Sequence, residues 1–160
     1  MELLINKSQK VVKLSPIYTV RKAVLSDVMF FYESIKETAN LTLNENEFDI
    51  IFKSKLKTKH NQLIVLLDQF GHAAGCAIIE FKITLTEGDL FSEMQFFYIQ
   101  PKYRKYFAAE ALYNEIEQIL LNKKCKKLIV STLLNATINQ RFYTKRGFKF
   151  VKKTYQKMIL

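Results

Sequence analysis

The sequence has little of what marks the special classes of protein. In its 160 residues there is no tryptophan, and there are only two cysteines, two prolines and four glycines. Two cysteines cannot form a disulfide scaffold, so we expect reduced thiols. Scarce glycine and proline exclude fibrous and low-complexity chains. No apolar run approaches the ~20 residues that cross a bilayer, and the first residues do not resemble a signal peptide. We therefore expect a cytoplasmic protein with no membrane partner.

The composition that is present is that of a globular protein. Apolar residues make up 49% of the chain and charged residues 25%, which is ordinary for a soluble domain. The length favours one domain with a substantial core. Residues 1–16 show little pattern, so we expect them to be an N-terminal extension to a single domain over residues 17–160.

The positive charge is concentrated in the last third of the chain. Residues 1–100 contain 11 Lys and Arg against 12 Asp and Glu, whereas residues 101–160 contain 14 against 3. The net charges of these parts are therefore −1 and +11. This asymmetry predicts an anionic ligand for the last third, although a solvated lysine-rich surface would give the same pattern.

Hydrophobic periodicity predicts alternating strands and helices. We expect strands over residues 17–24, 63–68, 74–84, 91–100, 128–134 and 148–159. We expect one helix that is capped by Ser26. Three more helices should cover residues 44–57, 107–122 and 138–145. Short turns join the three consecutive strands between residues 63 and 100, which predicts an antiparallel meander.

Two stretches carry a more specific pattern. In the first, the strand 94–99 is followed by Pro101 and by the loop Arg104-Lys105-Tyr106-Phe107-Ala108-Ala109, which leads into a helix. The second contains the motif Phe-Tyr-x-Lys-x-Gly-Phe, which lies on the short helix expected near residue 140 and at its end. Its residues are Phe142, Tyr143, Lys145, Gly147 and Phe148. Gly147 suits the left-handed residue that ends a helix.

Together with the element order, these stretches resemble the GNAT superfamily of N-acetyltransferases. The resemblance implies an α/β (α+β) fold, in which about four helices flank a mixed, mostly antiparallel sheet of six to seven strands. It also implies acetyl-CoA as co-substrate, no metal, and direct acetyl transfer to a primary amine in a ternary complex. The acceptor would be a small molecule or a peptide, and a homodimer is compatible with the apolar end of the chain.

The resemblance further implies the residues that would bind CoA. Backbone N–H groups at a helix start carry partial positive charge and can hold a pyrophosphate. These residues would be Phe107, Ala108 and Ala109, in a basic loop with Arg104, Lys105 and Tyr106. The backbone of Phe97, Tyr98 and Ile99 would pair with the pantetheine arm, and Asn135 is a further candidate. Phe107 departs from the family, which has glycine there, so its ring would either obstruct the pyrophosphate or turn inward as the first core residue of the helix.

Two residues are candidates for proton transfer. The strand of Glu93 resembles the one that carries the base in histone acetyltransferases, and a protonated amine must lose a proton before it attacks a thioester. Aromatic neighbours would raise the pKa of a carboxyl at this position. By resemblance, Tyr143 would return a proton to the departing thiolate. A tyrosine, with a pKa near 10, is protonated at neutral pH.

Two other functions remain open. The chain could be a catalytically inactive GNAT-like binding or regulatory module in which Phe107 marks the loss of the cofactor site. It could also contact nucleic acid through its basic last third, but lysines spread over several elements are a weak signal, so nucleic acid is disfavoured. The inactive module predicts no affinity for CoA, and the nucleic-acid hypothesis predicts binding that falls steeply with salt.

Overall fold

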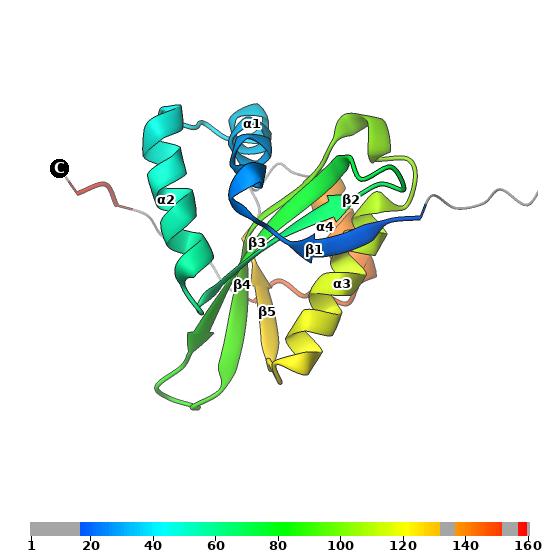
Figure 1. Ribbon diagram of the computed structural model, residues 1–160. Coiled ribbons are helices and arrows are strands. Elements are labelled where there is room, and N and C mark those ends of the chain that lie inside the picture. Colours follow the sequence, from blue (N-terminus) through cyan, green and yellow to red (C-terminus); the bar gives the residue numbers. More distant parts are fainter. Residues whose placement is uncertain (1–16, 132–136, 152–156, 160) are drawn as a thin grey trace, which may run out of the picture. The chain divides into compact units, whose positions relative to one another are not determined.

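A computed structural model describes residues 17–131, 137–151 and 157–159 of the chain (Figure 1). The chain divides into two compact units, Met1–Ile129 and Val130–Leu160. The first unit contains almost all of a five-stranded sheet, and the second contains the last helix. No helix in the described ranges is long and apolar enough to cross a membrane.

The sheet follows the order of the chain from one edge to the other. Its strands are β1 (Thr19–Lys22), β2 (Asn61–Leu67), β3 (Ala73–Ile83), β4 (Leu90–Ile99) and β5 (Lys127–Val130). The pairs β1–β2, β2–β3 and β3–β4 are antiparallel, so the predicted meander is confirmed. The N–H of Lys126 donates to the carbonyl of Leu90 at 2.8 Å. Because this contact joins the start of β5 to the start of β4, the two strands run parallel.

Three helices cover the two faces of this sheet (Figure 1). A short 3₁₀ helix, η1 (Leu25–Asp27), leads into α1 (Val28–Thr38), and α2 (Glu45–Lys57) follows on the same face. The opposite face is covered by α3 (Ala108–Asn122), which contacts β2, β3 and β4. A second 3₁₀ helix, η2 (Pro101–Tyr103), lies between β4 and α3.

The alternation of side chains along the strands divides the core between these faces. Leu63 and Val65 of β2 belong to the cluster that packs under α1 and α2, where the rings of Phe31 and Phe52 lie 5.1 Å apart. The alternate residue Ile64 is buried on the other face. The continuous apolar run 63–67 is therefore a strand that is covered on both sides.

The α/β class and the mostly antiparallel sheet expected from the sequence are confirmed, but the number of strands differs. The described residues contain five strands rather than six to seven. The expected last strand covers residues 148–159, and of these the described residues 148–151 and 157–159 are not in a strand. Residues 152–156 lie outside the described residues, as do residues 132–134, which were expected to extend β5. The predicted homodimer stays a prediction.

One further correction concerns the start of α1. Ser26 does not cap the helix, because the chain first makes the η1 turn and α1 begins only at Val28. The carboxylate of Asp27 accepts from the backbone N–H of Val24 at 2.7 Å and pairs with Arg21 at 2.7 Å. Asp27 is thus the side chain that holds this turn, and it ties the turn to β1.

Candidate active site

A β-bulge lies in the middle of β4. Ile78 of β3 pairs with Phe96, but the next residue, Ile79, pairs with Met94. Gln95 is therefore the extra residue on β4. Because of it, residues three positions apart on either side of the bulge, such as 93 and 96, lie on the same face of the sheet. Glu93 and Phe96 consequently point to the face that α1 and α2 cover, whereas strict alternation would have separated them.

The loop after β4 gives α3 a distinctive start. Phe107 is the residue before the helix, and its backbone is left-handed, with φ 59° and ψ 18°. Glycine adopts this conformation readily, whereas a residue with a side chain pays about 1–2 kcal/mol. The ring of Phe107 is 66% exposed and Ala108 is fully buried. Of the two alternatives for Phe107, the inward-turned ring is therefore excluded, because Ala108 is the first core residue of the helix.

The N-terminal end of α3, a helix of 15 residues, presents backbone N–H donors. The first N–H groups of an α-helix have no partner within the helix, and the positive end of the helix dipole lies there. Lys105 and Tyr106 are exposed beside these groups. The loop thus keeps the backbone features that a phosphate group needs, with an aromatic ring at its rim in place of a glycine.

Tyr103 anchors the loop to the turn between β2 and β3. Its hydroxyl donates to Asp68 at 2.7 Å, and the backbone N–H groups of Phe70 and His72 donate to the same carboxylate at 2.9 Å each. The hydrogen bond from Tyr103, with support from these backbone donors, lowers the pKa of Asp68 to about 2. Asp68 is not recognisable from the sequence alone, because the spacing between residues 68 and 103 matches no motif.

Arg104 and Tyr98, both predicted to contact the cofactor, meet a third side chain from α1. Arg104 donates from Nε to the carbonyl of Ile99 at 3.0 Å, and its Nη2 lies 4.0 Å from Glu37. The hydroxyl of Tyr98 donates to Glu37. Burial and then this hydrogen bond raise the pKa of Tyr98 to about 12. The guanidinium of Arg104 therefore points back toward β4 and α1.

The backbone segment proposed to pair with pantetheine lies at the end of β4. Its residues Phe97, Tyr98 and Ile99 pair with β3 on one side. On the other side β5 begins beside the start of β4 and has only four residues. It therefore runs along the first half of β4, and the end of β4 extends past it. Within this segment, the carbonyl of Ile99 already accepts from Arg104.

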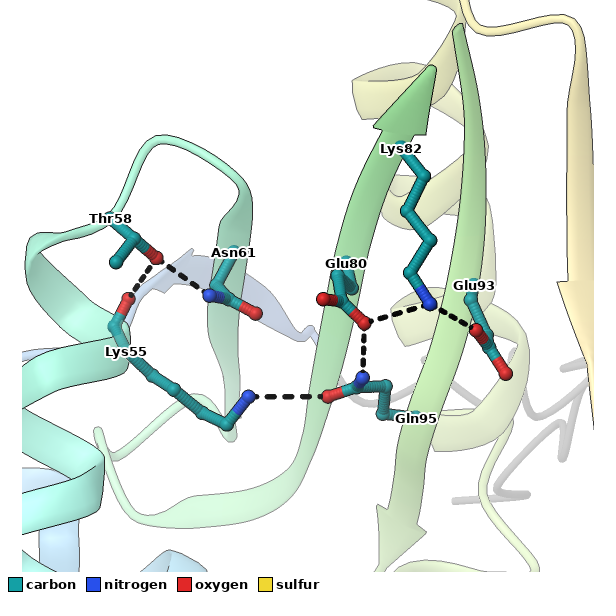
Figure 2. A network of polar contacts seen from close by, with 7 residues as sticks. All are labelled: Lys55, Thr58, Asn61, Glu80, Lys82, Glu93 and Gln95. Atoms are coloured by element: carbon teal, nitrogen blue, oxygen red, sulfur yellow. Dashed lines mark hydrogen bonds and ion pairs between the residues drawn. The ribbon is translucent and has the colours of Figure 1, made fainter. Parts of the chain in front are cut away.

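Glu93 lies in a network of charged and polar side chains, which Figure 2 shows from close by. Its Oε2 is 2.6 Å from Nζ of Lys82, and the same ammonium is 3.1 Å from Glu80. Gln95 donates to Glu80 and lies 3.5 Å from Nζ of Lys55 at the end of α2. The carboxylate of Glu93 is about one-third exposed and is paired with a cation, rather than enclosed by aromatic rings alone.

Lys82 was not singled out from the sequence, although a signal for it exists. Glu80 and Glu93 are direct partners across β3 and β4, and like charges in that position destabilise a sheet. Lys82 follows Glu80 by two residues and therefore lies on the same face. A pattern of Glu-x-Lys facing a glutamate on the next strand thus predicts this ion pair once the register is known.

Tyr143 belongs to the second unit, in α4 (Thr137–Lys145). Its ring lies 5.2 Å from that of Phe148, and burial raises the pKa of Tyr143 to about 12. Gly147 ends the helix with φ +82°, as expected. Phe148 N–H donates to Tyr143 and Gly147 N–H donates to Thr144, which is the Schellman arrangement. Asn135 lies outside the described residues.

A hollow of about 510 Å³ lies where β3 ends and β4 begins. It is thus at the opposite end of these strands from the loop that joins β4 to α3. It is lined by Lys59, His60, Phe81, Lys82, Ile83, Leu90 and Lys123. Lys59 and Lys123 follow the C-terminal ends of α2 and α3, where lysines balance the negative end of the helix dipole. Apart from Lys82, which contacts Glu93, the hollow does not involve the candidate residues described above.

Comparison with known proteins identifies the class. The model of the Acetyltransferase (GNAT) family matches residues 25–148, so the chain belongs to the GNAT acetyltransferase family. No curated protein sequence matches it.

Solved structures share its fold at low sequence identity. An acetyltransferase of Trypanosoma brucei has a TM-score of 0.72 at 20% identity, over 89% of this chain and 100% of that one. Glucosamine-6-phosphate N-acetyltransferase of Arabidopsis thaliana has a TM-score of 0.74 at 16% identity, over 89% and 98%. The enzyme AAC(6')-Iy, solved with a bisubstrate analogue that contains CoA, has a TM-score of 0.75 at 16% identity, over 89% and 99%.

Proposed function

We propose that the chain is an acetyl-CoA-dependent N-acetyltransferase that transfers the acetyl group directly to a primary amine in a ternary complex. The observation that carries the proposal is the left-handed backbone of Phe107, at the position where the family has glycine. The chain keeps the glycine-like backbone despite the strain of a phenylalanine there. The ring is exposed and not fixed in the core, so in this proposal it turns into solvent and the N–H groups at the start of α3 hold the pyrophosphate.

The residues of the chain can be assigned roles in this reaction. The start of α3, with Lys105 and Tyr106, holds the phosphates, and the end of β4 orients the pantetheine arm. Glu93 takes the proton that the acceptor ammonium must lose before it attacks the thioester carbonyl. Tyr143, whose raised pKa of about 12 keeps it protonated at neutral pH, returns a proton to the departing thiolate. Holding both reactants in one complex supplies much of the rate.

The acceptor is proposed to be a cationic amine, in a small molecule or a peptide. Glu80 and Glu93 lie on the face of the sheet that α1 and α2 cover, and Glu37 lies on α1. These carboxylates pair with Lys82 and Arg104, and in this proposal an acceptor ammonium takes the place of one of these cations. A structural neighbour, by its name, acetylates glucosamine-6-phosphate, which is consistent with a small amine.

Thermal unfolding with and without acetyl-CoA tests the proposal. Ligand at 100 times its Kd adds about 2.7 kcal/mol to the free energy of unfolding. For a chain of this length that raises Tm by roughly 5–10 °C. Salt-matched ATP serves as the control for unspecific binding of a phosphate-bearing anion to the basic surface. A shift with acetyl-CoA alone supports the proposal, whereas no shift at millimolar acetyl-CoA contradicts it.

A non-catalytic module is the second candidate function, and two observations favour it. The ring of Phe107 stands at the rim of the cofactor loop, and Lys82 already neutralises the proposed base. This alternative predicts that the chain has no affinity for acetyl-CoA. Release of free CoA thiol with a panel of primary amines separates the cases, because only the enzyme produces thiol in proportion to the amine added.

A further inference from the structure

Lys82 occupies the position on Glu93 that an acceptor amine needs. An amine loses its proton to a general base from within hydrogen-bond distance of that base. The ammonium of Lys82 lies 2.6 Å from Oε2 of Glu93 (Figure 2). No other ammonium among the described residues forms an ion pair with this carboxylate.

The surrounding side chains hold Lys82 there. Glu80 contacts the same ammonium at 3.1 Å, and Gln95 in turn donates to Glu80 and contacts Lys55. The bulge at Gln95 sets Glu93 on this face of β4. The lysine is therefore presented to Glu93 by fixed neighbours from β3, β4 and α2, and its side chain is 38% exposed, so a co-substrate can approach it.

We propose that Lys82 is itself an acetyl acceptor, modified by the acetyl-CoA that the same chain binds. The inference rests on the proposed function, in which the thioester lies beside Glu93. Glu93 takes a proton from the ammonium of Lys82, and the freed amine attacks the thioester carbonyl. A carbon–nitrogen bond forms as the carbon–sulfur bond breaks, so that Lys82 becomes an amide. The nitrogen loses its second proton as it becomes an amide, and the sulfur takes up that proton, so that CoA leaves as the thiol.

The ion pair of Lys82 allows catalysed acetylation to be distinguished from spontaneous acetylation, because the spontaneous reaction requires a neutral amine. The hydrogen bonds from Lys82 to Glu93 and then to Glu80 raise its pKa. Without catalysis, Lys82 should therefore react more slowly than an unpaired surface lysine. Lys127 is a control for ion pairing by itself, since its ammonium lies 3.1 Å from Glu87 and not beside Glu93.

The experiment incubates the full chain with acetyl-CoA and follows acetylation of each lysine by peptide mass spectrometry. We expect Lys82 to react about 100-fold faster than Lys127, and Glu93→Gln to remove that advantage. The rate constant at Lys82 should not depend on protein concentration, because the transfer occurs within one chain. Lys82→Arg keeps the positive charge and should show no acetylation at this position and no gain at Lys127.

Equal rates at Lys82 and Lys127, or an undiminished rate at Lys82 in Glu93→Gln, would overturn the inference. The same samples are melted with acetyl-CoA to separate this result from a failure of the proposed function. If Tm rises but Lys82 is not preferred, only the inference falls. If Tm does not rise and Lys82 is not preferred, the proposed function falls with it.

Discussion

At the scale of single residues, Phe107 shows how one position can conflict with its local backbone. Its φ of 59° belongs to the left-handed region, where a Cβ atom crowds the following carbonyl. Because the ring is largely exposed, it recovers little of this cost through packing. The surrounding structure, in which Tyr103 anchors one side of the loop and Ala108 the other, holds the residue in this conformation.

Replacing Phe107 therefore separates backbone strain from the effect of the ring. Phe107→Gly removes both, and we expect the free energy of unfolding to rise by about 0.5–1 kcal/mol, since glycine relieves the strain but adds freedom to the unfolded chain. Phe107→Ala removes the ring and keeps the strain, so we expect it to be less stable than Phe107→Gly by about 1 kcal/mol. Urea denaturation measures both, and an equal stability of the two variants would contradict a strained backbone.

Asp68 predicts a specific dependence of stability on pH. Its pKa in the folded chain is about 2, against an ordinary value of 3.8. A lowered folded-state pKa contributes stability that is present above pH 4 and is lost as the pH falls toward 2. Asp68→Asn should thus be less stable than the wild type near pH 7, and the difference should shrink between pH 4 and 2. Urea midpoints across this range measure it, and a difference that does not change with pH would contradict the assignment.

At the scale of elements, local signals suffice where the interaction itself is local. The side chain of Asn44 accepts from the N–H of Glu47 at 3.0 Å, and Glu47 accepts from the N–H of Asn44 at 2.9 Å. This is the capping box that the spacing Asn-x-x-Glu allows, and α2 spans Glu45–Lys57 where residues 44–57 were expected. The Schellman end of α4 at Gly147 is equally local and equally well predicted.

The cap of α2 gives a prediction with an internal control. Asn44→Ala should lower the free energy of unfolding by about 1 kcal/mol, because it leaves the N–H of Glu47 without its partner. Asn46→Ala lies two residues away, inside the helix and exposed, and should change stability little, since alanine is the better helix former. The urea midpoints of the two variants are compared with that of the wild type. Equal losses would show that the cap is not the cause.

At the scale of the whole molecule, the sheet separates two parts of the core. Val65 of β2 is fully buried under α1 and α2, whereas Ile116 of α3 is fully buried on the opposite face. Ile116→Val should cost about 0.5–1.5 kcal/mol by leaving a small cavity. The double variant with Val65→Ala should lose the sum of the two single losses to within about 0.5 kcal/mol, since the two side chains pack on opposite faces of the sheet. A larger departure in urea denaturation would show that the two faces are coupled.

The sequence alone determined the element order as far as α4, the antiparallel meander and the family of this chain, because hydrophobic period, caps and turns act between neighbours in the sequence. Tertiary structure decided the outward ring of Phe107, the bulge at Gln95 and the ion pair of Lys82 with Glu93. The bulge and the ion pair depend on the register of β3 and β4. The orientation of Phe107 depends on Ala108, and not Phe107, being buried against the sheet. A shift of one residue in that register would turn Glu93 away from Lys82, so the surroundings of the proposed base are set by strand pairing and not by the motif that contains it.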